Sequence, residues 1–182
     1  MKYNDDGTIK EIKVKSFDTL PVGTEVDYDG NTVPTGWEEV IGTNIITAGL
    51  NSDYATTSTN EEKLTLNKEI TKIGANLSLS SGSVVIGSGI NYIKISSQVN
   101  LSNGMQSGDR IMALIKKNNN NISVTNMIVR GLYETMFFSP KLISVSEGDT
   151  ISVYIRTLTR SGATIPSDSN FTYITVETVK EV

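Results

Sequence analysis

Two carboxylates in this chain, Asp109 and Asp149, each follow a glycine and stand directly before an alternating apolar stretch, forty positions apart. Carboxylates brought together from different strands are the arrangement that glycoside hydrolysis requires. An aspartate in a Gly-Asp turn, however, commonly bonds its own backbone. The turn explains both residues without chemistry, so we expect neither to be catalytic.

The other carboxylates form no better constellation. Glu38-Glu39 and Glu61-Glu62 are adjacent pairs, and adjacent residues of a strand point to opposite faces, so neither pair is expected to work as a catalytic dyad. The run Asp27–Asn31 resembles part of a calcium loop, but its glycine comes too early for an EF-hand and strand patterns flank it. A tight turn is the better interpretation of this run.

Histidine and cysteine are both absent from the 182 residues. Their absence removes the commonest general base near neutral pH, thiolate metal sites and disulfides. No G-x-S-x-G run and no glycine-rich phosphate loop ahead of a helix occurs either. The sequence therefore predicts no catalytic residue, no metal site and no cofactor.

Charge and hydropathy narrow the range of partners. A net charge of −4 does not attract a polyanion, so a nucleic-acid partner is not expected. No apolar run approaches the roughly 20 residues of a membrane span. The first residues lack the apolar core of a secretory signal. We expect a soluble protein with no membrane partner.

The elements that would position these side chains are strands. After Asp149, the residues Ile151, Val153 and Ile155 alternate with polar residues, which is the period of a half-buried strand. Similar blocks recur from residue 63 onward at spacings of about ten residues, with turn residues and no helical pattern between them. Eight or nine such strands predict an all-β fold, an antiparallel jelly roll or β-sandwich. The predicted strand blocks are Leu64–Leu66, Ile73–Leu79, Val84–Ile86, Ile90–Leu101, Arg110–Lys117, Ile122–Val129, Leu132–Ser139, Thr150–Leu158 and Phe171–Val179.

The first part of the chain has a different composition. Strand patterns over 8–15 and 24–28, with a turn at Asp29-Gly30-Asn31, predict a small β-hairpin unit. Residues 42–62 are polar and turn-rich, which predicts an extended linker with at most a short strand at Ile45-Ile46. The predicted organisation is an N-terminal hairpin segment over 1–41, a linker over 42–62 and a head domain over 63–182.

Two polar loops are candidates for contacts with a receptor. The polar tip Lys116–Asn121 lies between two strong strand blocks. Its composition predicts a solvated hairpin loop in which asparagine takes left-handed conformations. The alternative is a recognition loop, because rigid β-scaffolds often carry recognition on their loops. The loop from Arg160 to Ser167 offers the same possibility. The candidate receptor residues are Lys116, Lys117, Asn118, Asn119, Asn120, Asn121 and Arg160.

The aromatic residues lie mostly in the strong strand blocks, where we expect core or subunit-interface roles ahead of sugar stacking. In the block Leu132–Ser139, Met136 and Phe138 share one face and Phe137 lies on the other. Two apolar faces fit a strand that is covered by the sandwich on one side and by a neighbouring subunit on the other.

The stretch from Pro21 to Trp37 resembles the P-x-G-T…G…P-x-G-W element of bacteriophage tail-collar and tail-fibre proteins. The resemblance ends after Trp37, where collar proteins usually continue with an L-C-D-G-like run and this chain reads Glu38-Glu39-Val40-Ile41. It implies that this segment attaches the protein to other virion proteins. The matching positions are Pro21, Gly23, Thr24, Gly30, Pro34, Gly36 and Trp37.

The spacing of the two Gly-Asp corners, with Tyr92–Ile95 and Phe171–Val176, resembles the jelly-roll head of the C1q and TNF superfamily over about residues 70–179. Phage receptor-binding tips are often similar jelly rolls, and both groups are trimers. The resemblance therefore implies a homotrimer.

Together these features predict a non-enzymatic phage virion protein, made in the host cytoplasm. It would be a trimeric fibre or tail appendage whose jelly-roll head binds a host-surface receptor, with a glycan as the expected ligand. One alternative is a capsid head fibre or decoration protein without a receptor role. Others are a bacterial C1q-like or lectin-like binding module and, least favoured, a small polysaccharide depolymerase.

Overall fold

The computed structural model describes residues 2–3, 9–11, 24–26, 32–34, 44–168 and 170–179. The chain divides into two compact units, Met1–Gly42 and Thr43–Val182. In the first unit, β1 (Lys2–Tyr3) pairs antiparallel with β2 (Ile9–Glu11), and β3 (Thr24–Val26) with β4 (Thr32–Pro34). Strands β3 and β4 fall where the sequence predicts the two arms of the hairpin, and the turn between them lies outside the described residues.

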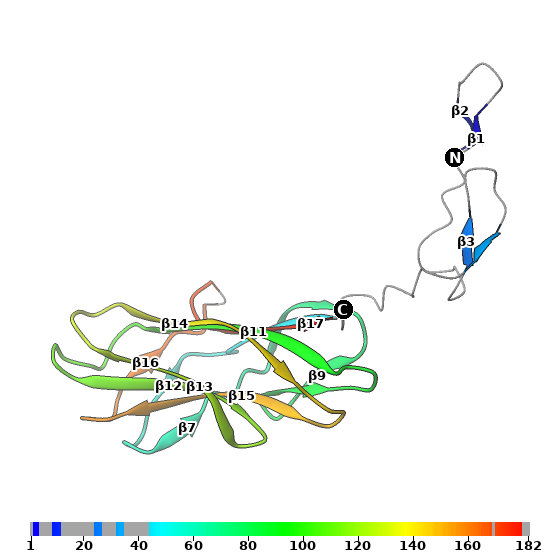
Figure 1. Cartoon of the computed structure of the whole chain (residues 1–182). Helices are drawn as coiled ribbons and strands as arrows, with labels where there is room; N and C mark the ends of the chain where they lie inside the picture. Colours follow the sequence, from blue (N-terminus) through cyan, green and yellow to red (C-terminus); the bar gives the residue numbers. More distant parts are fainter. Residues whose placement is uncertain are drawn as a thin grey trace. The chain divides into compact units, whose positions relative to one another are not determined.

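The second unit, called the head below, is a sandwich of two antiparallel sheets (Figure 1). The β12 sheet has the order β13-β12-β15-β10-β9, with β7 also paired to β15; the β11 sheet has the order β14-β11-β17-β5-β8. A short pair, β6 with β16, forms a separate two-stranded sheet. The bounds are β5 Ile45–Gly49, β6 Tyr54–Ala55, β7 Glu61–Lys63, β8 Lys68–Ile73, β9 Leu77–Ser80, β10 Ser83–Ile86, β11 Tyr92–Leu101, β12 Arg110–Lys117, β13 Asn120–Ile128, β14 Glu134–Ser144, β15 Thr150–Thr157, β16 Thr164–Ile165 and β17 Tyr173–Val179.

The predicted all-β jelly roll is confirmed: the described residues form strands and turns without a helix, and therefore no helix able to cross a membrane. In β15, Ile151, Val153 and Ile155 are buried in the core, as the alternation predicts. The opposite sheet supplies the other half of this core, with Ile93 and Ile95 of β11 among its fully buried side chains. A continuous apolar layer between two sheets is the main favourable term in the stability of such a fold.

The linker prediction for 42–62 is corrected by the structure. Strand β5 lies inside the β11 sheet, hydrogen-bonded to β17 on one side and β8 on the other. Ile46 and Ala48 of this strand are fully buried. Strands β6 and β7 also fall within the predicted linker. Small and polar residues give β5 a weak strand signal, but burial between two neighbouring strands stabilises it.

Three predicted strand blocks differ in detail. The block Ile73–Leu79 is broken by Gly74, whose φ of 77° ends β8 before β9 begins. Leu64 and Leu66 are buried but follow β7 rather than forming a strand. Strand β14 continues past the predicted end to Ser144, through Pro140. Proline is compatible with this strand because β14 is an edge strand and its pairing with β11 is irregular there.

Strand direction gives the head two ends. The near end, where β5 begins, also holds the end of β17, the start of β15 and the turn between β12 and β13. The Asn44 amide donates to Thr178 Oγ1 at 2.9 Å, so the chain enters and leaves the head at this near end. The far end holds the start of β12, the ends of β11 and β15, and the connection from β13 to β14.

Candidate functional site

The two Gly-Asp corners form the same turn twice. Gly108 and Gly148 have φ angles of 95° and 85°, a conformation that glycine adopts without penalty. In each corner the aspartate side chain accepts the backbone amide three residues earlier, Gln106 for Asp109 and Ser146 for Asp149, both at 2.8 Å. The interpretation that each aspartate caps its own turn is confirmed.

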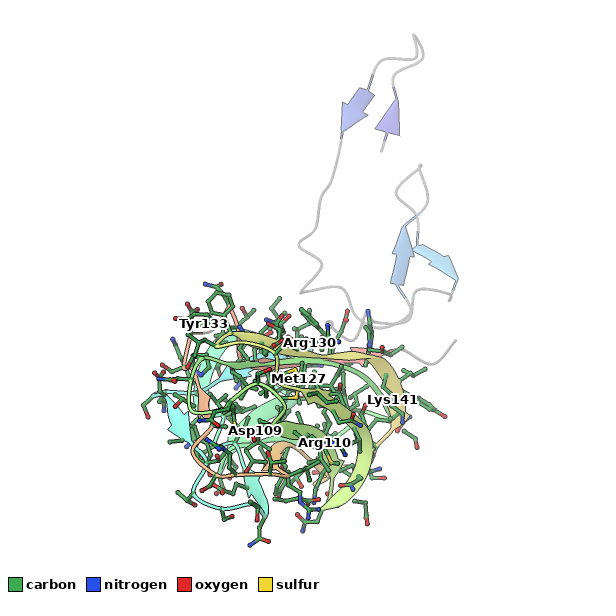
Figure 2. The ribbon with its side chains drawn as sticks, turned by 90° about the vertical axis from the view of Figure 1, so that its left-hand side faces the viewer. Asp109, Arg110, Met127, Arg130, Tyr133 and Lys141 are labelled. Carbon is green, nitrogen blue, oxygen red and sulfur yellow. The ribbon has the colours of Figure 1, made fainter. Side chains whose placement is uncertain are left out.

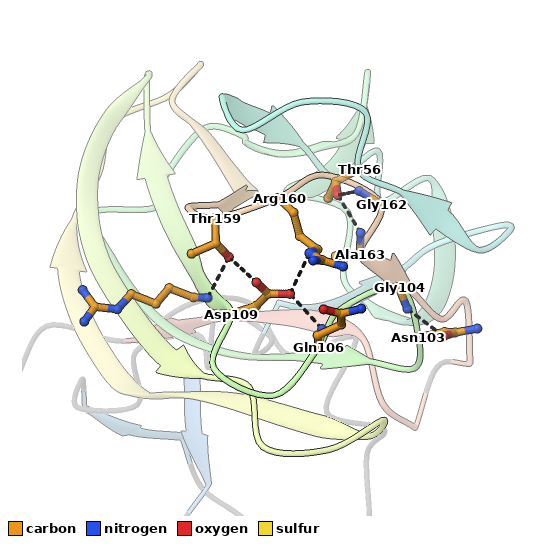
Figure 3. A network of polar contacts seen from close by, with 10 residues as sticks. Thr56, Asn103, Gly104, Gln106, Asp109, Thr159, Arg160, Gly162 and Ala163 are labelled. Carbon is orange, nitrogen blue, oxygen red and sulfur yellow. Dashed lines mark hydrogen bonds and ion pairs between the residues drawn. The ribbon is translucent and has the colours of Figure 1, made fainter.

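The remaining carboxylate contacts hold neighbouring loops in place. Asp109 accepts from Thr159 Oγ1 at 2.8 Å and from Arg160 Nε at 3.1 Å (Figure 3). The hydrogen bond from the Gln106 amide is the largest effect on the pKa of Asp109 and lowers it; burial opposes this, and the Thr159 hydroxyl and the Arg160 charge lower the pKa further. An aspartate held in its ionised form this way fixes neighbouring loops in place and is a poor general acid.

Asp149 is held in a similar way. It contacts Lys117 Nζ at 2.8 Å and Asn118 Nδ2 at 2.5 Å. Burial opposes ionisation, but the hydrogen bonds from Lys117, the Ser146 amide and Asn118 outweigh it and lower the pKa of Asp149.

The corners cannot form a catalytic pair. Asp109 precedes β12 and Asp149 precedes β15, and these strands run antiparallel over the register Ile111↔Thr157 to Lys117↔Ile151. At about 3.4 Å per residue, the two carboxylates are separated by about 20 Å or more. Glycosidases place their two carboxyl groups about 5–10 Å apart.

The first candidate receptor loop is a two-residue hairpin at the near end. Asn118 and Asn119 have φ angles of 48° and 68°, as in a type I′ turn, and Lys117 pairs with Asn120 across it. The left-handed asparagines that a solvated hairpin loop predicts are therefore present. Asn121 continues the ladder opposite Lys116.

The lysines and the first asparagine of this loop are already engaged within the head. Lys117 Nζ donates to the Ser144 carbonyl at 2.9 Å in addition to its ion pair with Asp149. Lys116 forms an ion pair with Glu61 and lies 4.5 Å above the Tyr154 ring. Asn118 Oδ1 accepts the Thr150 amide at 2.8 Å. A loop whose charges are neutralised internally offers little to a charged ligand.

Arg160, the remaining candidate, lies at the far end, so the structure does not bring the predicted receptor residues together. The far-end loops are held by a dense polar network (Figure 3). Buried Thr56 accepts the amides of Gly162 and Ala163 through its Oγ1 at 3.0 and 2.9 Å. Gly104 packs so closely on Gly162 that a Cβ there would lie 1.7 Å from the Gly162 carbonyl oxygen. These contacts make the far end a defined surface rather than loose loops.

Glu62 organises a loop that sequence reasoning assigned to the linker. It accepts the Tyr54 hydroxyl at 2.6 Å and the Ser58 amide at 2.7 Å. Burial, followed by the hydrogen bond and charge of Glu62, raises the pKa of Tyr54 to about 12. Glu61 instead pairs with Lys116, so the adjacent glutamates serve separate contacts. No periodic pattern in the sequence predicts these contacts of Glu62.

The predicted second apolar face of β14 is present. Met136 and Phe138 are buried in the core at 2% and 6% exposure, whereas Phe137 is 67% exposed. Phe137 lies opposite Gln98 of β11, which lies opposite Tyr173 of β17, so the three form one row across the outer face of the β11 sheet.

More apolar side chains surround this row. Strands β13 and β14 are the edge strands of the two sheets and pack beside each other. Six of the ten large exposed apolar residues that the structure describes lie on these strands or their connection, a cluster of the kind that favours contact with another surface. They are Val124, Ile128, Leu132, Tyr133, Phe137 and Leu142.

The stretch from Pro21 to Trp37, predicted to be an attachment segment, lies mostly outside the described residues. Thr24 and Pro34 lie directly opposite each other in the β3–β4 pair. The predicted turn Asp27–Asn31 lies outside the described residues, as do Pro21, Gly23, Gly30, Gly36 and Trp37. Among the residues that the structure does describe, no group of three or more carboxylates is placed to hold a metal ion.

Comparison with known proteins bears on the head alone. No protein-family model and no curated protein sequence matches the chain. Three crystal structures of murine APRIL, at pH 5.0, 8.5 and 8.0, match with TM-scores of 0.61, 0.59 and 0.60 at 11%, 12% and 12% identity. Each match covers 75% of this chain and 99% of the APRIL chain. At this identity the likeness concerns the fold, and the head has a TNF-like jelly-roll fold.

Proposed function

We propose that this chain is a non-enzymatic virion protein, a homotrimeric fibre or tail appendage of a phage or phage-like particle whose head binds a receptor on the host surface. The observation that supports a trimer is that strand β14 has apolar side chains on both of its faces. Its inner face fills the sandwich core, and its outer face leaves Phe137 in solvent. An exposed aromatic on an edge strand favours association, and a second copy of the chain is the occupant that we assign to it.

A closed trimer would explain both exposed regions. The edge formed by β13 and β14 on one subunit would pack against the outer face of the β11 sheet on the next, and three such heterologous contacts close a ring. That outer face carries the Phe137, Gln98 and Tyr173 row, and among its described residues Lys94 pairs with Glu177 at 3.8 Å. The TNF-like fold and the resemblance to trimeric C1q and TNF heads support this arrangement.

The virion role rests on the first unit. The P-x-G-T…P-x-G-W element resembles tail-collar and tail-fibre proteins, and it precedes the head in the chain. A small hairpin unit tethered to a trimeric head suits a protein that is anchored by one part and exposed by the other. Three copies of a modest receptor site then gain strength through avidity.

Light scattering on the purified chain tests the trimer, and a monomer at micromolar concentration would contradict it. Adsorption to a panel of bacterial cells and purified cell walls tests the receptor role. Labelled antibody on purified particles tests the virion role and separates tail from capsid attachment. A trimer that decorates the capsid and binds no cell surface would favour the decoration alternative.

A further inference from the structure

All four arginines of the chain lie at the far end of the head. Arg110 is the first residue of β12, Arg156 is the second-last of β15, Arg130 follows β13 by two residues, and Arg160 lies in the loop after β15. The positions are dispersed in sequence. They converge because β12 runs antiparallel to both β13 and β15.

The strand register places Arg110, Arg156 and Arg130 close together on the surface of the far end. Arg156 lies opposite Met112, two residues from Arg110 on the same strand face, so Arg110 and Arg156 are diagonal neighbours about 7–8 Å apart. The Val129 amide donates to the Asp109 carbonyl at 2.8 Å, which holds the residue after Val129, Arg130, beside the start of β12. Figure 2 looks onto this end and shows Arg110 and Arg130 on it, with the exposed Tyr133 near the rim.

Two of the four arginines, Arg110 and Arg130, carry charge that is not paired within the described part of the head, whereas Arg160 is paired and Arg156 lies opposite Glu61 of β7. Arg160 pairs with Asp109, and Arg156 Nε donates to the Thr59 carbonyl at 3.2 Å. Among the described residues, Arg110 and Arg130 form no ion pair and are exposed. Residues 1–42 hold four lysines and nine carboxylates, a charge of −5, so the remainder of the chain carries +1 of the total −4.

We propose that this arginine patch (Arg110, Arg130, Arg156 and Arg160) binds an acidic polysaccharide, and this inference rests on the proposed receptor role of the head. The planar guanidinium matches carboxylate, sulfate and phosphate groups with two parallel hydrogen bonds. The patch spans three adjacent strands, about 10 Å of sheet width, which suits a polymer with repeated anionic groups better than one small anion. In a trimer the patch occurs three times, which multiplies weak contacts with a repeating ligand.

A nucleic acid is the less favoured polyanion. Domains that bind nucleic acid are usually basic overall, with a pI above about 9. The head is not such a domain, because residues 43–182 carry a net charge of only +1. Long-range attraction of a polyanion is therefore weak, and binding depends on local contacts at the patch.

The test uses the full-length chain and immobilised polygalacturonate, dextran sulfate and neutral dextran. We expect binding to one or both acidic polymers, none to dextran, and weakening as salt rises from 50 to 200 mM. The comparison of the two acidic polymers distinguishes carboxylate from sulfate. The variant Arg110→Gln with Arg130→Gln should bind at least tenfold more weakly. The control Lys68→Gln with Lys72→Gln removes the same charge from β8 and should bind as the unmodified chain does.

Wild-type affinity in the arginine variant, or an equal loss in the lysine control, would overturn the proposal. Equal affinity for duplex DNA would also overturn it, because the patch would then lack preference for a glycan. Cell adsorption separates the two levels of inference. Adsorption that survives in the arginine variant refutes the patch as the receptor site but leaves the receptor role standing, whereas no adsorption by the unmodified chain refutes that role itself.

Discussion

Replacing Phe137 with aspartate should dissociate the proposed trimer without unfolding the head. Phe137 is 67% exposed in the isolated chain and projects from the face of β14 opposite the core. The aspartate side chain fits in solvent, so the monomer should keep its stability. In a trimer the same change would place an unpaired charge at an apolar contact.

The size of the effect follows from the exposed area. A buried phenylalanine hides about 150–250 Å², so the exposed two-thirds of Phe137 corresponds to about 100–170 Å². At about 25 cal/mol per Å², covering it contributes about 2.5–4 kcal/mol per subunit, or about 60-fold or more in affinity at each contact. The desolvation of the new carboxylate adds to this loss.

Sedimentation velocity over a concentration series, with thermal unfolding in parallel, measures both quantities. Leu158→Asp is the matched control, because Leu158 is 39% exposed but lies in the far-end loop after β15. This control should remain trimeric. If the Phe137 variant stays trimeric at nanomolar concentration, or if both variants dissociate alike, the assignment of β14 to the subunit interface is wrong.

Other predictions concern stability. Gly104→Ala should cost about 3 kcal/mol or more in urea unfolding, because a Cβ would lie 1.7 Å from the Gly162 carbonyl oxygen, whereas Gly148→Ala meets open space and should cost about 1–2 kcal/mol for its left-handed backbone; equal costs would contradict the close packing. The lowered pKa of Asp149 implies stability that is present above about pH 4 and lost as pH falls through the folded-state pKa, and Asp149→Asn should remove this part of the acid dependence and cost about 1 kcal/mol at pH 7 for the hydrogen bonds lost at a solvent-screened site. If the free energy of unfolding of this variant changes with acid pH as that of the unmodified chain does, these contacts do not hold Asp149 in its ionised form. Asn119→Gly should stabilise the head by about 0.5 kcal/mol, since φ is 68° there, and a lower urea midpoint would show that the side chain matters more than the backbone.

The strands that alternate cleanly could be predicted from the sequence. Ile151, Val153 and Ile155 reveal β15 because each second residue faces the core. Strand β5 could not be predicted in full, because Ala48 and Gly49 carry little strand preference and their burial depends on neighbours more than a hundred residues later.

Predicting which candidate site residues lie together requires information that local sequence patterns do not contain. The sequence identifies the polar loops near Asn118 and Arg160 but not the end of the sandwich to which each belongs, since that requires strand direction. The arginine patch was missed for the same reason: Arg110, Arg130 and Arg156 are separated by 20 and 26 residues and become neighbours only through antiparallel pairing.

The position of β5 also determines how the head would carry a mechanical load. A pull between the tether at Asn44 and a ligand held at the far end would run along β5, parallel to its axis. Antiparallel hydrogen bonds lie perpendicular to the strands, so this pull would shear the bonds to β17 and β8 together instead of opening them one by one. The head would therefore resist extraction of its first strand under such a load, and a domain tethered through an edge strand would peel at a lower force.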